Sequence, residues 1–97
     1  MEFRLNVYSW RGILIPISRW VIYKEIELER GYQDRTHGSL DERNPSIDEW
    51  LEILHTELEE VYEAKSNDHK LEELLQVVSV GVACLEQHGV IRRKELQ

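Results

Sequence analysis

The sequence has little of several features that mark particular classes of protein. Its single cysteine, Cys84, can form neither an internal disulfide nor a cysteine zinc site, so we expect a small buried hydrophobic residue in a reducing compartment. The apolar stretch 13–17 is too short to cross a membrane, and no small-residue cleavage site accompanies it. No spacing of Ser, His and Asp, or of Cys and His, supports a nucleophilic triad. These absences predict a cytoplasmic protein without a membrane segment.

Basic residues are also scarce. The chain has 12 Lys and Arg against 19 Asp and Glu, which gives a net charge of −7. It lacks the basic stripe that nucleic-acid-binding proteins carry. The imbalance is strongest between residues 41 and 73, where twelve acidic residues meet three basic ones. Such a surface repels phosphate unless cations intervene, and we expect no nucleic-acid partner.

The 97 residues suffice for one small domain. Residues 1–15 show no clear period and form an N-terminal arm. The weak alternation of residues 1–8 fits either a short strand or an irregular segment. Residues 16–97 are predicted to form a single helical domain. Because the core of such a domain is modest, we expect oligomerisation to complete it.

Hydrophobic periodicity predicts three main helices, of which the first begins near Pro16. It is expected to end at about Arg30, because Gly31 favours the end of a helix. Residues 34–45 are polar and contain glycine and proline, so they predict a loop.

The second and third helices have clearer start signals. Ser46 and Glu49 have the spacing of a capping box, in which each side chain binds the other residue's backbone N–H. Asn67 or Asp68 is expected to cap the third helix, which runs over about residues 69–87.

The third helix is apolar around almost its whole circumference between Val77 and Leu85, where only Ser79 is polar. A helix of this kind is buried on several sides, and in a short chain part of that burial must come from a second subunit. The predicted fold class is all-α: an antiparallel helical bundle of about three main helices, completed by assembly into a homodimer or homotetramer.

Carboxylates recur at helical spacing in the second and third helices. Glu57 and Glu60 are three residues apart, as are Glu73 and Gln76, so each pair shares a helix face. If the helices pack as a hairpin, the pairs face each other, and converging oxygen atoms are what a hard divalent cation binds. Such pairs also occur on many solvated helix faces, and spacing alone leaves both interpretations open. The density of like charge, which a cation relieves, favours a metal site.

These residues carry a resemblance to the MazG-like all-alpha nucleoside triphosphate pyrophosphohydrolases. That family has a Glu-Glu-x-x-Glu motif on one helix and Glu-x-x-Asp on the next. Residues 56–60 resemble the first motif, with Thr56 in place of the leading Glu. Residues 73–76 resemble the second, with Gln76 in place of Asp.

The closer likeness is to short phage-type members of this family. These have the string Glu-Arg-x-x-Gln-Asp-x-x-Trp-Gly, then a Glu-Trp-Leu helix, then Glu-Glu-Leu-x-Gln-Val. The corresponding segments here are 29–38, in which His37 replaces Trp, 48–51 and 72–77. The likeness covers roughly residues 27–88.

The resemblance implies a hydrolase, dependent on Mg²⁺ or Mn²⁺, that converts a nucleoside triphosphate to the monophosphate and pyrophosphate. It implies that Glu57, Glu60 and Glu73 are the catalytic metal ligands and Gln76 a neutral fourth ligand. Because a Gln carbonyl brings no charge, Gln76 and Thr56 favour an alternative, a catalytically weak or inactive helical oligomer that binds a nucleotide or a protein partner. A helical interaction module without a small-molecule role is a third alternative.

Four further residues are candidates for substrate binding by the same resemblance. Arg30, Gln33 and Asp34 either border the substrate pocket or form the polar end of a helix. Trp50 either stacks on a nucleobase, since every base has a π-face, or packs beside Pro45 at the start of the second helix.

Overall fold

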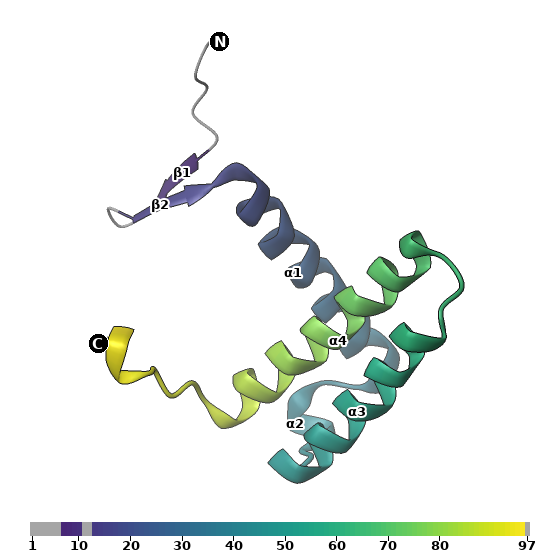
Figure 1. The fold of residues 1–97 in the computed structure, drawn as a ribbon. Helices are drawn as coiled ribbons and strands as arrows, with labels where there is room; N and C mark the ends of the chain where they lie inside the picture. Colours follow the sequence, from purple (N-terminus) through teal and green to yellow (C-terminus); the bar gives the residue numbers. More distant parts are fainter. Residues whose placement is uncertain (1–6, 11–12, 97) are drawn as a thin grey trace.

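The computed structural model describes residues 7–10 and 13–96. Most of these residues are helical, and the predicted all-α fold with about three main helices is confirmed (Figure 1). The elements, in chain order, are β1 (Val7–Trp10), β2 (Ile13–Pro16), α1 (Ile17–His37), α2 (Leu40–Arg43), α3 (Ile47–Glu63), α4 (Asn67–His88) and a 3₁₀ turn (Lys94–Leu96).

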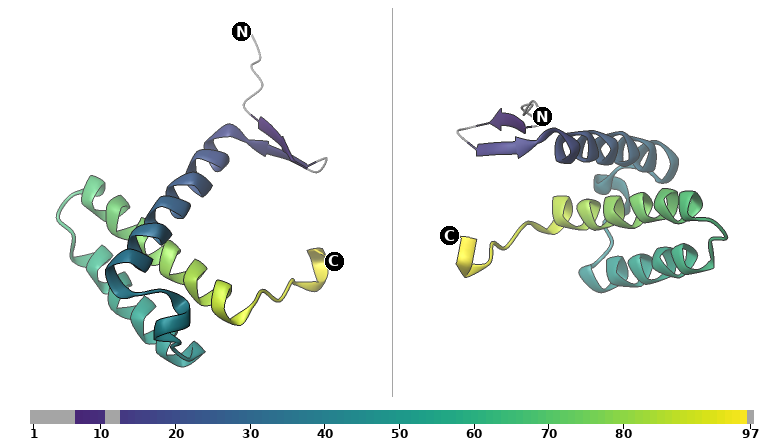
Figure 2. Two further views of the ribbon diagram at one scale, coloured as in Figure 1. Left: turned by 180° about the vertical axis from the view of Figure 1, so that it is seen from behind. Right: turned by 45° about the horizontal axis from the view of Figure 1, so that its top comes forward.

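The helices form layers in which α4 lies between α1 and α3 (Figure 2). Helices α3 and α4 run antiparallel as a hairpin, and the C-terminal half of α1 packs across α4 (Figure 1). Among the described residues, no helix combines the length and the apolar character needed to cross a bilayer.

A small β-hairpin precedes α1. Strands β1 and β2 are antiparallel, with Val7 opposite Pro16 and Trp10 opposite Ile13. Of the two readings of the N-terminal arm, a strand therefore holds for residues 7–10, while residues 1–6 and 11–12 lie outside the described part of the chain.

Helix α1 is longer than predicted. It continues through Gly31 to His37, and its C-cap is Gly38, whose φ of 89° suits a residue without a side chain. Glycine inside a helix costs only about 1 kcal/mol relative to alanine, and contacts made by Arg30 and Gln33 on either side of Gly31 offset this cost. The predicted loop over residues 34–45 is consequently wrong, because it holds the last turn of α1 and the short helix α2.

The capping box of α3 is confirmed. The Glu49 N–H donates to Ser46 Oγ at 3.1 Å, and the Ser46 N–H donates to Glu49 Oε1 at 2.9 Å. These two hydrogen bonds hold the pKa of Glu49 below its usual value. Helix α4 is capped by Ser66, whose Oγ accepts from the His69 N–H at 3.1 Å, and not by the predicted Asn67 or Asp68.

The core of the described chain is small. Trp50, Val80 and Ala83 form its buried centre. Cys84 packs against this centre half-buried, less completely than the sequence predicted. Partly buried hydrophobic side chains also pack against the cluster: Leu40, Ile53 and Leu54.

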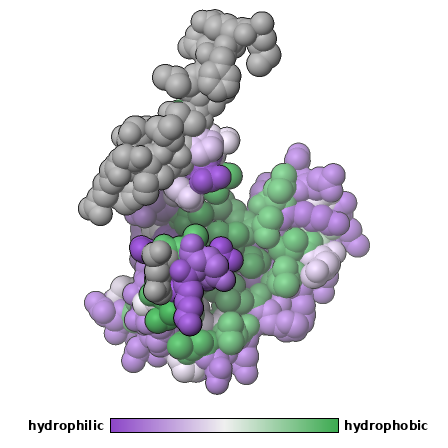
Figure 3. Space-filling view, turned by 60° about the vertical axis from the view of Figure 1, so that its left-hand side comes forward, coloured by the Kyte–Doolittle hydropathy of each residue, from purple (hydrophilic) through white to green (hydrophobic). Residues whose placement is uncertain are grey.

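The apolar stretch of α4 is only partly covered. Ser79, Val80 and Ala83 face inward, but Val78 remains 42% exposed and Leu85 49% exposed. Hydrophobic surface gathers on the face of the molecule that Figure 3 turns toward the viewer. The burial predicted for this stretch is therefore incomplete within one chain.

Candidate metal centre

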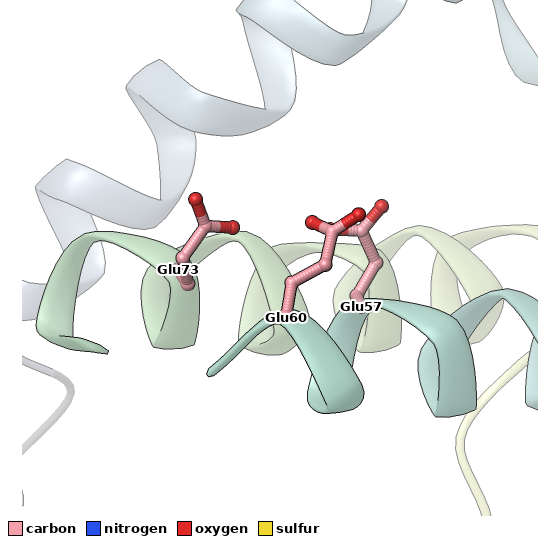
Figure 4. Close-up of side chains that lie close together, drawn as sticks. All are labelled: Glu57, Glu60 and Glu73. Atoms are coloured by element: carbon pink, nitrogen blue, oxygen red, sulfur yellow. The ribbon is translucent and has the colours of Figure 1, made fainter. Parts of the chain in front are cut away.

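Three carboxylates from α3 and α4 converge at the predicted position. We call Glu57, Glu60 and Glu73 the acidic cluster. Each contributes one oxygen atom, and these three atoms lie within 4.8 Å of one another (Figure 4). The convergence follows from the helical spacing of Glu57 and Glu60 on α3 and from the antiparallel packing of α4 against α3.

The environment of the acidic cluster disfavours its charges. Glu57 Oε2 and Glu73 Oε2 are buried and make no hydrogen bond in the described part of the chain. Burial raises the pKa of Glu57 above its usual value, and the nearby Glu60, Glu73 and Glu29 raise it further. Buried carboxylate oxygens without donors are suited to bind a cation, which relieves both the desolvation and the mutual repulsion.

A histidine adjoins this cluster from within α4. His69 Nε2 lies 3.2 Å from Glu73 Oε1, one helical turn away. The contact occupies one oxygen of Glu73 and leaves the buried Oε2 atom unpartnered.

A cavity of about 240 Å³ opens beside the acidic cluster, between α1, α3 and α4. One end of it, the acidic end, is lined by Glu29, Glu57 and Gln76. On α3, Trp50 lies seven residues before Glu57 and therefore roughly 10 Å away along the helix axis. The cavity thus extends from carboxylates to an aromatic ring.

The other end of the cavity is aromatic. The lining also includes Tyr32, Gln33, His37, Arg43 and Trp50, and we call the part around Trp50 and Arg43 the aromatic end. The guanidinium carbon of Arg43 lies 5.4 Å from the centre of the Trp50 ring, in the geometry of a cation–π contact.

Only two of the four residues considered for substrate binding line the cavity. Gln33 and Trp50 line the cavity, whereas Arg30 and Asp34 do not. Trp50 is 1% exposed, and its indole N–H donates to Gln87 Oε1 at 2.8 Å. Trp50 is therefore both a core residue and part of the cavity wall.

Arg30 braces α1 against α4. Its guanidinium donates two hydrogen bonds to Glu86, of 3.1 and 2.9 Å, and one to Asp34 at 3.0 Å. It also donates to Gln33 Oε1 at 3.2 Å, while being itself only 3% exposed. The hydrogen bonds to Glu86 are the main cause that raises the pKa of Arg30, so the guanidinium stays charged.

The two residues at which the chain departs from the family motifs lie in different places. Gln76 is half-buried and lines the cavity beside Glu57. Thr56 is exposed, and its hydroxyl donates to the Glu52 carbonyl at 3.2 Å. Only the departure at Gln76 bears on the acidic cluster.

Glu29, Tyr32 and Arg43 are site residues to which the sequence assigned no role. Glu29, Gln33 and His37 follow one another at intervals of four residues and so share one face of α1. This alignment is visible in the sequence only if α1 continues past Gly31, which the predicted helix end concealed. Arg43 lay in the predicted loop.

Comparison with known proteins finds no family model that matches the chain, no similar curated protein and no similar solved structure.

Proposed function

We propose that this chain is a Mg²⁺-dependent nucleotide pyrophosphohydrolase of the MazG-like class, which acts in the cytoplasm. One observation carries the proposal: the acidic cluster, with two buried and unpartnered carboxylate oxygens, stands at one end of a cavity whose other end is aromatic. The two ends of a nucleoside triphosphate would match the two ends of this cavity, since its phosphates need cations and its base needs a flat apolar surface.

The donor set fits a hard divalent cation. Glu57, Glu60 and Glu73 would hold Mg²⁺ or Mn²⁺ through oxygen atoms, and the carbonyl of Gln76, which lines the cavity, would serve as a neutral fourth ligand. Bound Mg²⁺ supplies neutralisation of phosphate charge and a lowered pKa of water. Glu29 lines the same cavity outside the acidic cluster, and this carboxylate would accept a proton from the attacking water.

A second function is favoured by Gln76. A neutral amide in place of an acidic ligand weakens the hold on a divalent cation, which is what a catalytically weak or inactive nucleotide-binding oligomer would show. The aromatic end of the cavity would serve this function equally well, because it needs no metal to accept a base.

The test is pyrophosphate release from a panel of nucleoside and deoxynucleoside triphosphates, with and without Mg²⁺. We expect metal-dependent release that Glu73→Gln lowers by at least about 100-fold, because this change removes one charged ligand. Glu72→Gln is the matched control, since Glu72 is exposed and lies outside the acidic cluster. Nucleotide binding without pyrophosphate release would favour the second function, and equal rates for wild type and Glu73→Gln would contradict the metal site.

A further inference from the structure

The hydrogen bond from Arg30 fixes the orientation of the Gln33 amide group. Arg30 Nη1 donates to Gln33 Oε1 at 3.2 Å. Because a guanidinium carries only donors, the Gln33 carbonyl oxygen must face Arg30 and its amide nitrogen must face away. The Arg30 side chain is held in this orientation, since its guanidinium donates two hydrogen bonds to Glu86 and a third to Asp34.

This arrangement leaves the amide nitrogen of Gln33 for the cavity. Gln33 is 8% exposed and lines the cavity wall. Within residues 7–10 and 13–96, its amide nitrogen makes no hydrogen bond to another protein group, although its oxygen does. This nitrogen is not among the buried atoms that lack a partner, so it is open to the cavity and can donate to an acceptor atom of a ligand.

Arg43, which also lines the cavity, is a further donor. The Nε atom of Arg43 donates to the Gly38 carbonyl at 3.0 Å, and its guanidinium lies over the Trp50 ring. Trp50 offers no donor, because its N–H is already bound to Gln87 and the residue is only 1% exposed. The carboxylates of the cavity, Glu29 and Glu57, lie at its acidic end.

The geometry points to Gln33 as a specificity-determining residue that selects nucleobases presenting a carbonyl oxygen, and disfavours those presenting an amino group in its place. An oxo group accepts from the Gln33 amide, whereas an amino group meets it donor to donor and leaves both unpaired. This inference rests on the proposed function, since it assigns the base preference of the same cavity.

Two matched pairs of substrates test the preference. Inosine and adenosine triphosphates differ in an oxo or amino group on the purine ring, and deoxyuridine and deoxycytidine triphosphates differ likewise on the pyrimidine ring. With Mg²⁺ and the full chain, we expect kcat/KM for pyrophosphate release to favour the oxo member of each pair by about tenfold, the effect of roughly one hydrogen bond.

Two variants of Gln33 distinguish the effect of its amide donor from the effect of its side-chain length. Gln33→Glu keeps the oxygen that Arg30 binds but replaces the donor with an acceptor, so the preference should reverse toward the amino members. Gln33→Met keeps the length and removes the donor, so both ratios should approach one. Thr36→Glu is the control, because it adds the same charge at an exposed position of α1 outside the cavity, and it should keep the wild-type ratios.

The outcomes distinguish this inference from the proposed function. Absence of pyrophosphate release from all four substrates would remove the proposed function and this inference with it. Release at ratios near one in the wild type would overturn the base preference alone. A uniform loss across the four substrates in Gln33→Glu would place Gln33 against the sugar or the phosphates, and would also overturn the assignment.

Discussion

The carboxyl group of Glu57 is half-buried among three other carboxylates, those of Glu60, Glu73 and Glu29. Because its pKa is raised in the folded state, the folded protein keeps this proton to a higher pH than the unfolded chain does. The stability of the metal-free protein should therefore fall as pH rises from the ordinary carboxyl range through the raised pKa of Glu57. Folding and metal binding make opposite demands on this side chain, since a metal ligand must be ionised.

Replacing Glu57 by glutamine should change the stability of the metal-free protein and the response to Mg²⁺ in opposite directions. Above the raised pKa, Glu57→Gln should stabilise the metal-free protein by roughly 0.5 kcal/mol for each like-charged neighbour that it relieves, and should flatten the pH dependence of stability. The same change should abolish most of the rise in melting temperature that millimolar Mg²⁺ gives the wild type through mass action. Thermal unfolding across pH, with and without Mg²⁺, measures both effects.

Glu63→Gln is the control for this experiment, because Glu63 is exposed on α3 and outside the acidic cluster. It should leave the pH dependence and the response to Mg²⁺ as in the wild type. A Glu57→Gln protein that still gains the full Mg²⁺ stabilisation would show that the ion binds elsewhere.

Among the elements, α1 depends on α4 for its position, and Arg30 is the side chain that joins them. Arg30→Met should destabilise the protein by roughly 1–3 kcal/mol, because Gln33, Asp34 and Glu86 lose a charged donor together. The loss should be local, with faster amide hydrogen exchange along the C-terminal half of α1 and little change in α3. Hydrogen exchange followed by mass spectrometry reads out both helices in one experiment.

Arg35→Met is the matched variant on the same helix, since Arg35 is exposed. Exchange in α1 should remain slow in this variant. Equal protection of α1 in the Arg30→Met and Arg35→Met proteins would mean that hydrophobic contacts alone hold α1 in place.

The sequence predicts those elements whose signals are local. The Ser46–Glu49 capping box lies within four residues, and the spacing of Glu57 and Glu60 is a property of one helix, so both could be found without a structure. The end of α1 could not, because Gly31 favours termination locally while the opposing contact comes from Glu86, fifty-six residues after Arg30. The cavity could not be predicted either, since its wall depends on how three helices pack.

At the scale of the whole molecule, the chain is more extended than one compact domain. Its radius of gyration is 16.0 Å, against about 12.5 Å expected for a compact chain of this length. Among the described residues, the buried hydrophobic side chains are only Trp50, Ala64, Val80 and Ala83. Large hydrophobic side chains stay exposed on α1 and α4: Ile17, Val21, Leu28, Tyr32, Leu71, Val78 and Leu85. Such exposed apolar side chains are what the predicted association of chains would cover.

The sequence-based prediction of a homo-oligomer therefore remains, and the structure shows which residues test it. Val78→Glu or Leu85→Glu places a charge on apolar surface of α4 that one chain leaves uncovered, so either should dissociate the assembly. Val80 and Ala83 are unsuitable, because they are buried within a single chain and their substitution would disrupt its core.

Tyr62→Glu is the control, because it changes an exposed aromatic residue on α3, and it should leave the mass of the assembly unchanged. Light scattering at micromolar concentration, with circular dichroism to confirm folding, measures the result, and a wild-type protein that is a well-folded monomer would refute the assembly.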